Sequence, residues 1–563
     1  MEIGQNIPFL QRNTKPLFYA AWLLVALLHA GNSGLFDDEA YYWMYARHPD
    51  WGYFDHPPMI GFLIGAGYQL FHNEFGLRLF IVLISTGTLW AIDSLLEKRD
   101  DRLFYAISLS MGLLQIGGII AVPDIPLMFF VVLFFLAYRR FLARQGALEI
   151  ILVALTIAGM LYSKYHGILI VFFSLISNIR LLTKWQTYAV GLLALALFSP
   201  HLFWQFQHDY PSFRYHLFER NASYYKADYT FEYVFGQILM AGPLIGWLLL
   251  WAAAKKKVET DLEKALKYCL LGIYPFFLLS TFKGRVEANW TAPAYISLIV
   301  LSHQYLTATP IVARWVYRLF IPSFLIVLVA RVYMMIDIDP LPFFPKDEFH
   351  RNKEWSTIVH EKAAGKSVVF VNTYQRPSQY NFYSGDSAFG LNNIFYRRNN
   401  YNFWPLEQAL MGKSALVISH ENYDYFTDTI HTPRGFIGSR IIDPFFSFSR
   451  VDIRSSSRLE VSEGILHAEI EVNIPVELTT HLSYHRFDTA QIVMSIFKRD
   501  KKKAILIQTG ARLKDVREGN LKVDCKLPAS FAAGEYQIKW GINTAIPGWP
   551  SLNSSGYELV IRD

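Results

Sequence analysis

The feature that most constrains the fold of this chain is a series of apolar segments, each long enough to cross a lipid bilayer. About 20 mostly apolar residues make one transmembrane helix. The first 340 residues contain about eleven such segments: 16–31, 77–96, 103–121, 126–142, 148–163, 166–182, 186–204, 234–253, 266–282, 290–307 and 312–336. Only 18% of the 563 residues are charged and 52% are hydrophobic, which excludes an ordinary soluble protein, a coiled coil and a disordered chain. We therefore expect a polytopic α-helical membrane protein.

Basic residues in the short loops between these segments predict how the spans are oriented. Lys and Arg are concentrated in every second loop, beginning with Arg12 and Lys15 before the first span. Loops of this kind face the cytoplasm in membrane proteins. Because the predicted number of spans is odd, we expect the chain after about residue 340, and the long loop 32–76, on the opposite side of the membrane.

The sequence changes character after the last span and predicts three regions. Residues 1–340 form the membrane domain, 341–444 a small α/β domain and 445–563 a β-sandwich-like domain. The α/β prediction rests on two short apolar runs typical of buried strands, 367–372 and 414–419. The β-sandwich prediction rests on segments with alternating apolar and polar residues: 465–473, 491–498, 504–508, 535–541 and 557–562.

Acidic residues are concentrated in the first outer loop. The ionisable residues that we single out there are Asp37, Asp38, Glu39, Asp55 and His56. Carboxylates at the end of a membrane helix are costly to keep unless they bind a cation or act as a base. The alternative is that they are solvated residues of a surface loop. Two acidic clusters in one loop, interleaved with aromatic residues, favour a functional site.

Further polar residues lie in the other outer loops. They are Asp124, Lys164, His166, Lys283 and Arg285. Asp124 precedes a proline-containing first turn, so it caps a helix, takes part in a site, or does both. The basic residues either extend toward lipid headgroups or hold a phosphate group, since they share one side of the membrane with the acids.

One short motif resembles a metal site but is not assigned as one. Asp337-Ile338-Asp339 has the Asp-x-Asp pattern of soluble nucleotide-sugar transferases. It follows the last predicted span directly, without the α/β fold that uses such a motif. We therefore predict no metal there.

Four motifs in the outer loops occur in a recognisable order. They are Asp38-Glu39-Ala40-Tyr41-Tyr42-Trp43, Gly52-Tyr53-Phe54-Asp55-His56-Pro57-Pro58-Met59, Pro123-Asp124-Ile125-Pro126 and Ser163-Lys164-Tyr165. Together they resemble the bacterial protein O-mannosyltransferase family, which belongs with the lipid A aminoarabinose transferases to the GT-C superfamily of membrane glycosyltransferases. The resemblance covers about residues 15–310 and leaves out the β-rich tail after 445.

The resemblance implies a fold and a set of partners. We expect a GT-C membrane domain with its catalytic loop at 32–76, in a bacterial inner membrane, with the C-terminal region in the periplasm. The implied donor is a sugar on a polyprenyl phosphate. The implied acceptor is a hydroxyl of a lipid, glycan or protein, and nucleic acid is not an expected partner.

The resemblance also implies roles for individual residues. Asp38 and Glu39 hold the catalytic positions, with Asp38 as the base or the acceptor-positioning carboxylate. Asp55 and Asp124 match acids that organise a metal or the donor phosphate, so a divalent cation of unknown identity is a possible cofactor. The expected donor-binding residues are His56, Asp124, Lys164, His166, Lys283 and Arg285. His56 stands where the aminoarabinose branch has a lysine, which disfavours aminoarabinose transfer.

The predicted function is therefore sugar transfer from a polyprenyl-phosphate donor to a hydroxyl group, with inversion at the anomeric carbon. The alternative is a transporter or flippase of lipid-linked sugars. A transporter is expected to place ionisable groups near the middle of the bilayer and to have two related halves. In this sequence the carboxylates lie in outer loops and no repeat is visible.

Overall fold

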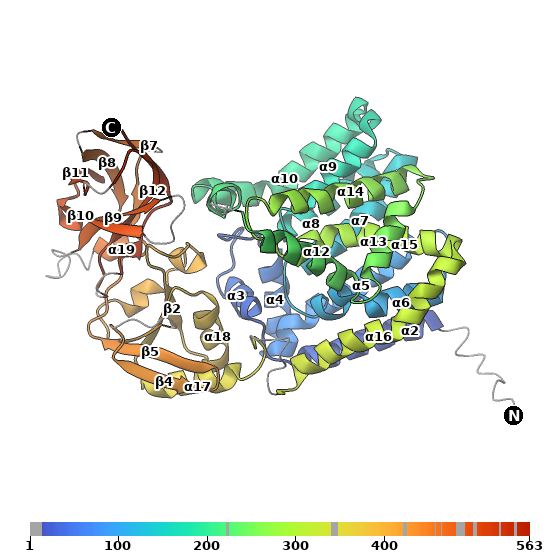
Figure 1. The fold of residues 1–563 in the computed structure, drawn as a ribbon, viewed down its shortest axis with the longest axis horizontal. Helices are drawn as coiled ribbons and strands as arrows, with labels where there is room; N and C mark the ends of the chain where they lie inside the picture. The colour runs from blue at the N-terminus through green and yellow to red at the C-terminus, as the bar shows by residue number, and fades with distance from the viewer. Residues whose placement is uncertain are drawn as a thin grey trace. The chain divides into compact units, whose positions relative to one another are not determined.

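A computed structural model of the chain divides into two compact units, Met1–His350 and Arg351–Asp563 (Figure 1). The structure describes residues 14–220, 225–338, 347–419, 425–456, 458–462, 464–479, 490–498, 504–528, 531–544, 546 and 549–562. The first unit is helical and the second contains two β-sheets.

The helices of the first unit follow the predicted apolar segments. They are α2 (Thr14–Gly31), α3 (Asp37–Arg47), α4 (Met59–Leu70), α5 (Glu74–Asp93), α6 (Asp101–Ser110), η1 (Leu113–Gly117), α7 (Asp124–Ala143), α8 (Ala147–Ser163), α9 (Gly167–Ser177), η2 (Ile179–Thr183), α10 (Trp185–Gln207), α11 (Pro211–Arg214), η3 (Tyr215–Glu219), α12 (Ala227–Ala241), α13 (Gly246–Lys255), α14 (Asp261–Ser280), η4 (Ala288–Ala294), α15 (Tyr295–Ala308) and α16 (Pro310–Met335). Every predicted span overlaps one of these helices or a consecutive pair of them.

Only some of these helices can cross a bilayer by their own length and composition. In the described part of the chain four helices pass that test, namely α5, α7, α10 and α16, and the bent pair α12–α13 adds a fifth if it forms one span. The count of about eleven spans therefore stays a prediction. Four apolar helices are sufficient to place the protein in a membrane.

Two predicted spans are interrupted for local reasons. The segment 234–253 bends by 89° between α12 and α13, where Gly242 has a φ of 136° and is followed by a proline. The segment 103–121 stops being α-helical after Ser110, where Met111 is extended, and continues as the π-helix η1. Apolarity of a segment predicts burial in lipid or protein, but it does not show where the backbone breaks.

One large apolar core holds the helices together. It is built largely from α5–α8, α13–α15 and their neighbours. Helix α7 packs against α5 and α8, and α8 also contacts α10, while α14 packs against α9 and α15. The loop 32–76 forms two short helices, α3 and α4, and α4 packs against both α3 and α5. Asp37, Asp38 and Glu39 of the first outer loop therefore lie on a helix that packs against α4.

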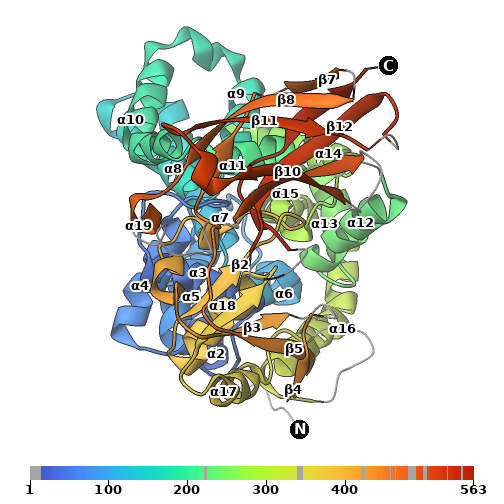
Figure 2. The ribbon, with the colours of Figure 1, turned by 90° about the vertical axis from the view of Figure 1, so that its left-hand side faces the viewer.

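The first sheet of the second unit matches the predicted α/β region. Its strands are β1 (Ser367–Val371), β2 (Ala388–Leu391), β3 (Ala415–Ser419), β4 (Asp428–Thr432) and β5 (Gly435–Ile442), in the order β2-β1-β3-β5-β4. Strand β1 is parallel to β2 and β3, whereas β5 is antiparallel to β3 and β4. Helix α17 (Asn352–Ala363) packs against α18 (Gln375–Ser384) beside this sheet (Figure 2). The two predicted apolar runs are the central strands β1 and β3.

The second sheet contains the predicted alternating segments. Its strands are β6 (Asp452–Arg454), β7 (Arg458–Ser462), β8 (Ile465–Asn473), β9 (Gln491–Lys498), β10 (Ala504–Arg512), β11 (Asn520–Lys526), β12 (Gly534–Ile542), β13 (Ser551–Leu552) and β14 (Tyr557–Ile561). They form one hydrogen-bonded sheet around a single apolar cluster (Figure 2). In the main order of paired strands, β10 and β11 are the two end strands. The strands pair continuously, and the β-sandwich-like architecture stays a prediction. Alternation fixes which side chains face the core, but it does not fix which strands pair.

Candidate active site

The helix that carries the first acidic cluster is fixed by a buried arginine. Arg78 of α5 donates from Nε to Glu39 Oε1 (2.7 Å) and from Nη2 to Glu39 Oε2 (2.5 Å). The same guanidinium donates to the backbone oxygens of Ala30, Ser33 and Gly34, at distances from 2.7 to 3.2 Å. Arg78 therefore ties the end of α2 to the start of α3.

Glu39 accepts two further hydrogen bonds, both from backbone amides. The N–H of Phe36 donates to Oε2 at 2.8 Å, and the N–H of Ala121 donates to Oε1 at 2.7 Å. Glu39 is fully buried, so its carboxylate joins α3, α5 and the segment that leads into α7. Each oxygen of this carboxylate accepts two hydrogen bonds. These contacts position α3, and the catalytic role of Glu39 stays a prediction.

Asp38 lies on a different face of α3. Residues four apart on a helix share a face, so Asp38 lies one turn before Tyr42. The ring of Tyr42 meets the ring of His56 edge to face, with centroids 5.5 Å apart. Asp38 is partly exposed, in contrast to Asp37 and Glu39, which are buried. Asp38 is thus the acid of this cluster that solvent can reach most easily.

The second acidic cluster is bound to the same helix. Tyr45 of α3 donates from its hydroxyl to Asp55 Oδ1 at 2.5 Å, and both side chains are buried. Burial raises the pKa of Tyr45 well above its usual value, and the adjacent Asp55 carboxylate raises that pKa further. Tyr45 is therefore a permanent donor that holds the Asp55 carboxylate in place.

The segment around Asp55 is also anchored by helix α10. Trp204 donates from Nε1 to Asp50 Oδ2 at 2.8 Å, and His201 Nδ1 donates to the backbone oxygen of Trp51 at 2.7 Å. A Cβ at Gly52 would collide with the Trp204 ring, so only glycine fits between the segment and the helix. These contacts explain why a segment without regular secondary structure has a defined position.

The π-helix η3 holds the other side of this segment. His216 Nε2 donates to the backbone oxygen of Asp55 at 2.9 Å. Burial lowers the pKa of His216, and burial together with the nearby Lys164 ammonium lowers the pKa of His56 well below its usual value. Both rings are therefore neutral near pH 7. The Nδ1 atom of His56 is buried and has no hydrogen-bond partner among the described residues, so it is available to a ligand.

A lysine–aspartate pair lies at the start of α7. Lys164 Nζ contacts both oxygens of Asp124, at 2.9 and 3.0 Å, and both side chains are more than nine-tenths buried. Asn289 donates from Nδ2 to Asp124 Oδ2 at 2.8 Å. Because Asp124 is the first residue of α7, its charge also lies at the positive end of the helix dipole. Asp124 therefore combines a place in the first turn of α7 with an ion pair, whereas the N-cap position predicted for it is held by Pro123.

These elements surround a cavity of about 330 Å³. Five of the predicted donor-binding residues line it: His56, Lys164, His166, Lys283 and Arg285. The structure adds Tyr165, His216, Arg220 and Trp290, among others. The predicted outer loops thus meet around one space, although they are far apart in the sequence. Asp124 does not line the cavity itself, but it contacts the lining residue Lys164.

Individual lining residues differ in how firmly they are held. The His166 ring packs against Phe277 and Trp290, with centroids 5.1 and 5.3 Å away. The Arg220 guanidinium lies 4.1 Å from the centre of the Trp290 ring. Arg285 is exposed and pairs with Glu232 at 3.0 Å. Lys283 is also exposed.

Sequence reasoning did not single out several residues that build this site. Arg78, Tyr45, His216 and Arg220 belong to no motif that we recognised, and their roles depend on contacts with distant segments. Buried charges need a partner, so an arginine in an apolar span such as Arg78 could have been recognised as the partner of an acid.

The carboxylates that we expected to bind a divalent cation do not fit one. Both oxygens of Asp124 contact the Lys164 ammonium, whose positive charge opposes a cation at the same atoms. Asp55 Oδ1 accepts the Tyr45 hydroxyl. Among the described residues, Asp55 and Asp124 belong to no group of three close metal-ligating side chains. We derive no chemical step through a metal ion, and the divalent cation stays a prediction.

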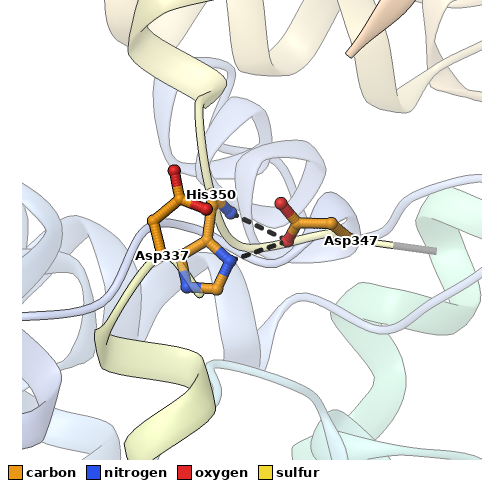
Figure 3. A group of neighbouring side chains, drawn as sticks. All are labelled: Asp337, Asp347 and His350. Atoms are coloured by element: carbon orange, nitrogen blue, oxygen red, sulfur yellow. Dashed lines mark hydrogen bonds and ion pairs between the residues drawn. The ribbon is translucent and has the colours of Figure 1, made fainter. Parts of the chain in front are cut away.

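Asp337, from the Asp-x-Asp motif, lies close to Asp347 and His350 (Figure 3). Asp339, the other acid of the motif, lies outside the described residues. Asp347 Oδ1 accepts from the backbone N–H groups of Phe349 and His350 and from His350 Nδ1, at 3.0 to 3.1 Å. These bonds lower the pKa of Asp347 and close a turn after the last helix.

Comparisons with known proteins agree on the architecture. A family profile described as dolichyl-phosphate-mannose-protein mannosyltransferase matches residues 55–204. The crystal structure of ArnT from Cupriavidus metallidurans in the apo state superposes with a TM-score of 0.57 at 12% identity, covering 76% of this chain and 98% of that one. Its complex with undecaprenyl phosphate gives a TM-score of 0.52 at 14% identity, with the same coverage. The chain has the GT-C membrane glycosyltransferase fold. The resemblance predicted from the sequence motifs is confirmed.

Lipid A galacturonosyltransferase RgtD of Rhizobium johnstonii is a curated relative, 23% identical over 304 residues. This chain spans 63% of the length of that relative, and the match includes 51% of this chain. Within the GT-C fold, the profile match at 55–204 contains Asp55, His56, Asp124, Lys164 and His166. The part of the chain that matches the profile therefore contributes His56, Lys164 and His166 to the cavity lining.

Proposed function

We propose that this protein is a membrane glycosyltransferase that moves a sugar from a polyprenyl-phosphate donor to a hydroxyl group. The observation that carries the proposal is the cavity beside the Lys164–Asp124 pair, whose ionisable lining residues are basic or histidine, apart from Tyr165. A donor phosphate needs positive charge, and a leaving phosphate needs more of it. The GT-C fold and the ArnT complex with undecaprenyl phosphate support the same donor class.

Lys164 is the central residue of the proposed phosphate site. It is buried, and its ammonium is held in position by Asp124 and, through Asp124, by Asn289. A cation positioned before the reaction stabilises developing negative charge without further rearrangement. His56 is neutral, and its unpartnered Nδ1 atom can bind a phosphate oxygen as an N–H donor.

Asp38 is the proposed base. In the transfer step, the acceptor hydroxyl oxygen forms a bond to the anomeric carbon while the bond from that carbon to the phosphate oxygen breaks. The lipid phosphate leaves with the electron pair, and the hydroxyl proton passes to the Asp38 carboxylate. Direct displacement of this kind inverts the anomeric centre. Asp38 suits the role because it is partly exposed and lies one turn from Tyr42, which contacts the cavity residue His56.

The location and the acceptor belong to the proposal as well. We place the reaction at the periplasmic face of a bacterial inner membrane, because the site is built from loops that the distribution of Lys and Arg puts outside the cytoplasm. The acceptor is a lipid, glycan or protein hydroxyl. The name of the curated relative, a lipid A transferase, favours a lipid acceptor.

The test is transfer of a radiolabelled sugar from a panel of polyprenyl-phosphate donors by purified protein, with lipid, glycan and protein acceptor extracts present. We expect transfer by the wild type and a loss of about 10²- to 10⁴-fold in Asp38→Asn. Asp37→Asn is the matched control, because it changes the neighbouring acid of the same helix turn. Both variants must match the wild type in size-exclusion profile.

The possible outcomes test the assignment of the base and the class of enzyme separately. Full activity of Asp38→Asn would reject this base but keep the enzyme class. If no donor is consumed and labelled lipid instead crosses proteoliposome membranes, the protein is a transporter of lipid-linked sugars and the proposal is wrong.

A further inference from the structure

Three side chains of the metal-ligating kind meet just after the last membrane helix, at residues that do not line the cavity (Figure 3). Asp337 follows α16, and Asp347 and His350 lie further along the chain. Each offers one ligand atom, and these atoms all lie within 4.8 Å of one another. The sequence predicted no metal here, because the Asp-x-Asp motif stands without the fold that uses it. The folded chain adds a histidine and a second carboxylate, which the motif does not contain.

Two of the ligand atoms already have the separation of neighbouring ligands of one ion. His350 Nδ1 lies 3.0 Å from Asp347 Oδ1. Zinc binds histidine nitrogen and carboxylate oxygen at about 2.0–2.2 Å, so two neighbouring ligands of one zinc ion lie about 3.0–3.5 Å apart. The backbone N–H groups of Phe349 and His350, which donate to Asp347 Oδ1, hold this carboxylate in place. Asp337 is exposed, so its side chain can rotate toward the other two.

The histidine is held as a fixed ligand rather than as a mobile surface group. Its side chain is only 7% exposed, and its ring packs perpendicular to that of Tyr333 of α16, with centroids 5.4 Å apart. The second ring nitrogen, Nε2, is buried and has no hydrogen-bond partner among the described residues. Because no donor within that part of the chain opposes a proton at Nε2, the neutral ring can carry its proton there and bind an ion through Nδ1.

We propose that Asp337, Asp347 and His350 bind a divalent transition-metal ion such as Zn²⁺. A set of one imidazole nitrogen and two carboxylate oxygens suits Zn²⁺, whereas Ca²⁺ and Mg²⁺ prefer oxygen ligands alone. Three protein ligands leave the fourth position of a tetrahedral zinc ion to water, which reaches the site on the exposed side of Asp337. The inference does not depend on the proposed sugar transfer, and no step of that reaction passes through this ion.

The ion joins the end of α16 to a segment that contacts the start of α3. Phe349 lies between the ligands Asp347 and His350, and its ring meets the ring of Phe36, with centroids 5.7 Å apart. Phe36 directly precedes α3 and donates its N–H to Glu39. The role of the ion is therefore to stabilise this part of the membrane unit.

The experiment measures metal binding directly, on full-length untagged protein in detergent. After dialysis against EDTA and removal of the chelator, the protein is titrated with Zn²⁺, Co²⁺, Mg²⁺ or Ca²⁺. We expect one Zn²⁺ or Co²⁺ to bind per chain and to raise the unfolding temperature, with no comparable effect of Mg²⁺ or Ca²⁺. The visible absorption of bound Co²⁺ reports the nitrogen and oxygen ligands independently of stability.

Two variants test the assigned ligands. Asp337→Asn and His350→Gln should each weaken Zn²⁺ binding at least about tenfold and abolish the rise in unfolding temperature. Asp337→Asn keeps the test decisive if His350→Gln does not fold, because Asp337 is exposed. His467→Gln is the matched control, since His467 forms an exposed pair with Asp524 and should not contribute to the site.

The remaining outcomes overturn the proposal. Zn²⁺ binding that is unchanged in Asp337→Asn, or that is lost in His467→Gln, shows that the ion binds elsewhere. Equal binding of Mg²⁺ or Ca²⁺ contradicts a site with a histidine ligand. If neither Zn²⁺ nor Co²⁺ binds, the three side chains form only a hydrogen-bonded turn.

Discussion

Arg78 and Glu39 form a bidentate ion pair in which the side chains are only 1% and 0% exposed. The pair joins α3 and α5, which are separated in the sequence by the whole segment 48–73. It also fixes the turn on which Asp38 lies. An uncompensated charge at this depth has no solvent to stabilise it. In the acidic motif, Glu39 therefore holds the helix in place, and Asp38 is left accessible to solvent.

Removal of either partner of this pair is expected to destabilise the protein strongly. Glu39→Ala or Arg78→Ala leaves an unpaired buried charge, which costs about 3–5 kcal/mol. The check is the midpoint of thermal unfolding in detergent, or the yield of monodisperse protein if folding fails. Arg214→Ala is the control, because Arg214 forms an exposed pair with Asp209 that contributes about 0–1 kcal/mol. Similar midpoints for Glu39→Ala and Arg214→Ala would show that the buried pair contributes little.

The pair between Lys164 and Asp124 leads to a different expectation. In Asp124→Asn the buried ammonium loses its counter-charge, so the protein without ligand is less stable by about 3–5 kcal/mol. Undecaprenyl phosphate then supplies the missing negative charge, and we expect it to raise the unfolding temperature of Asp124→Asn by more than that of the wild type.

A double variant separates the structural from the binding role of this pair. Lys164→Gln combined with Asp124→Asn removes both charges, so most of the lost stability returns. The double variant should show no rise in unfolding temperature with undecaprenyl phosphate. A normal rise would mean that the phosphate binds elsewhere.

The stability of the ligand-free protein should fall as the pH decreases below about 6.5. Burial lowers the pKa of both His56 and His216, so these rings stay neutral in the folded state while the unfolded chain takes up protons. Above pH 7 both states are neutral and the effect vanishes. Below that, the free energy of unfolding decreases by up to about 1.4 kcal/mol per pH unit for each histidine, until the folded state also protonates. His216→Gln should give a flatter profile of unfolding temperature between pH 5.5 and 7.5 than the wild type, and an equally steep profile would contradict this assignment.

Treatment with a chelator tests the divalent cation that the sequence predicted. Because Lys164 contacts both oxygens of Asp124, we expect sugar transfer to be unchanged after dialysis against EDTA. The measurement is the transfer rate before dialysis, after dialysis, and after adding back Mg²⁺, Mn²⁺ or Zn²⁺. Loss of activity that a metal restores would show that a cation binds at atoms other than these.

The sequence predicted much of the membrane unit because a membrane span depends on the residues within that span. An apolar run of about 20 residues is recognisable without knowledge of its neighbours. The start of α7 at Asp124 and the end of α8 before Lys164 follow from such runs. The break between α12 and α13 was not predicted, although Gly242 and the proline after it could have indicated it.

The candidate site was predicted as a set of residues but not as an arrangement. His56, Lys164, His166, Lys283 and Arg285 line one cavity, as their shared side of the membrane suggested. The role of each of these residues could not be predicted, because a pattern of residues does not reveal which charges neutralise each other. Glu39 is the clearest case, since its pairing with Arg78 spans 39 positions.

The sequence by itself determined that this chain enters a membrane, which loops share one side, and which family of enzymes it resembles. These properties depend on composition, on the distribution of charge and on short motifs, all of which are local. Only the tertiary structure decided that Glu39 is paired with Arg78, that Asp124 is paired with Lys164, and that Arg220 lies against the ring of Trp290. The physical reason is that the charge available to a ligand is what remains after buried groups have paired, and pairing depends on distances in space.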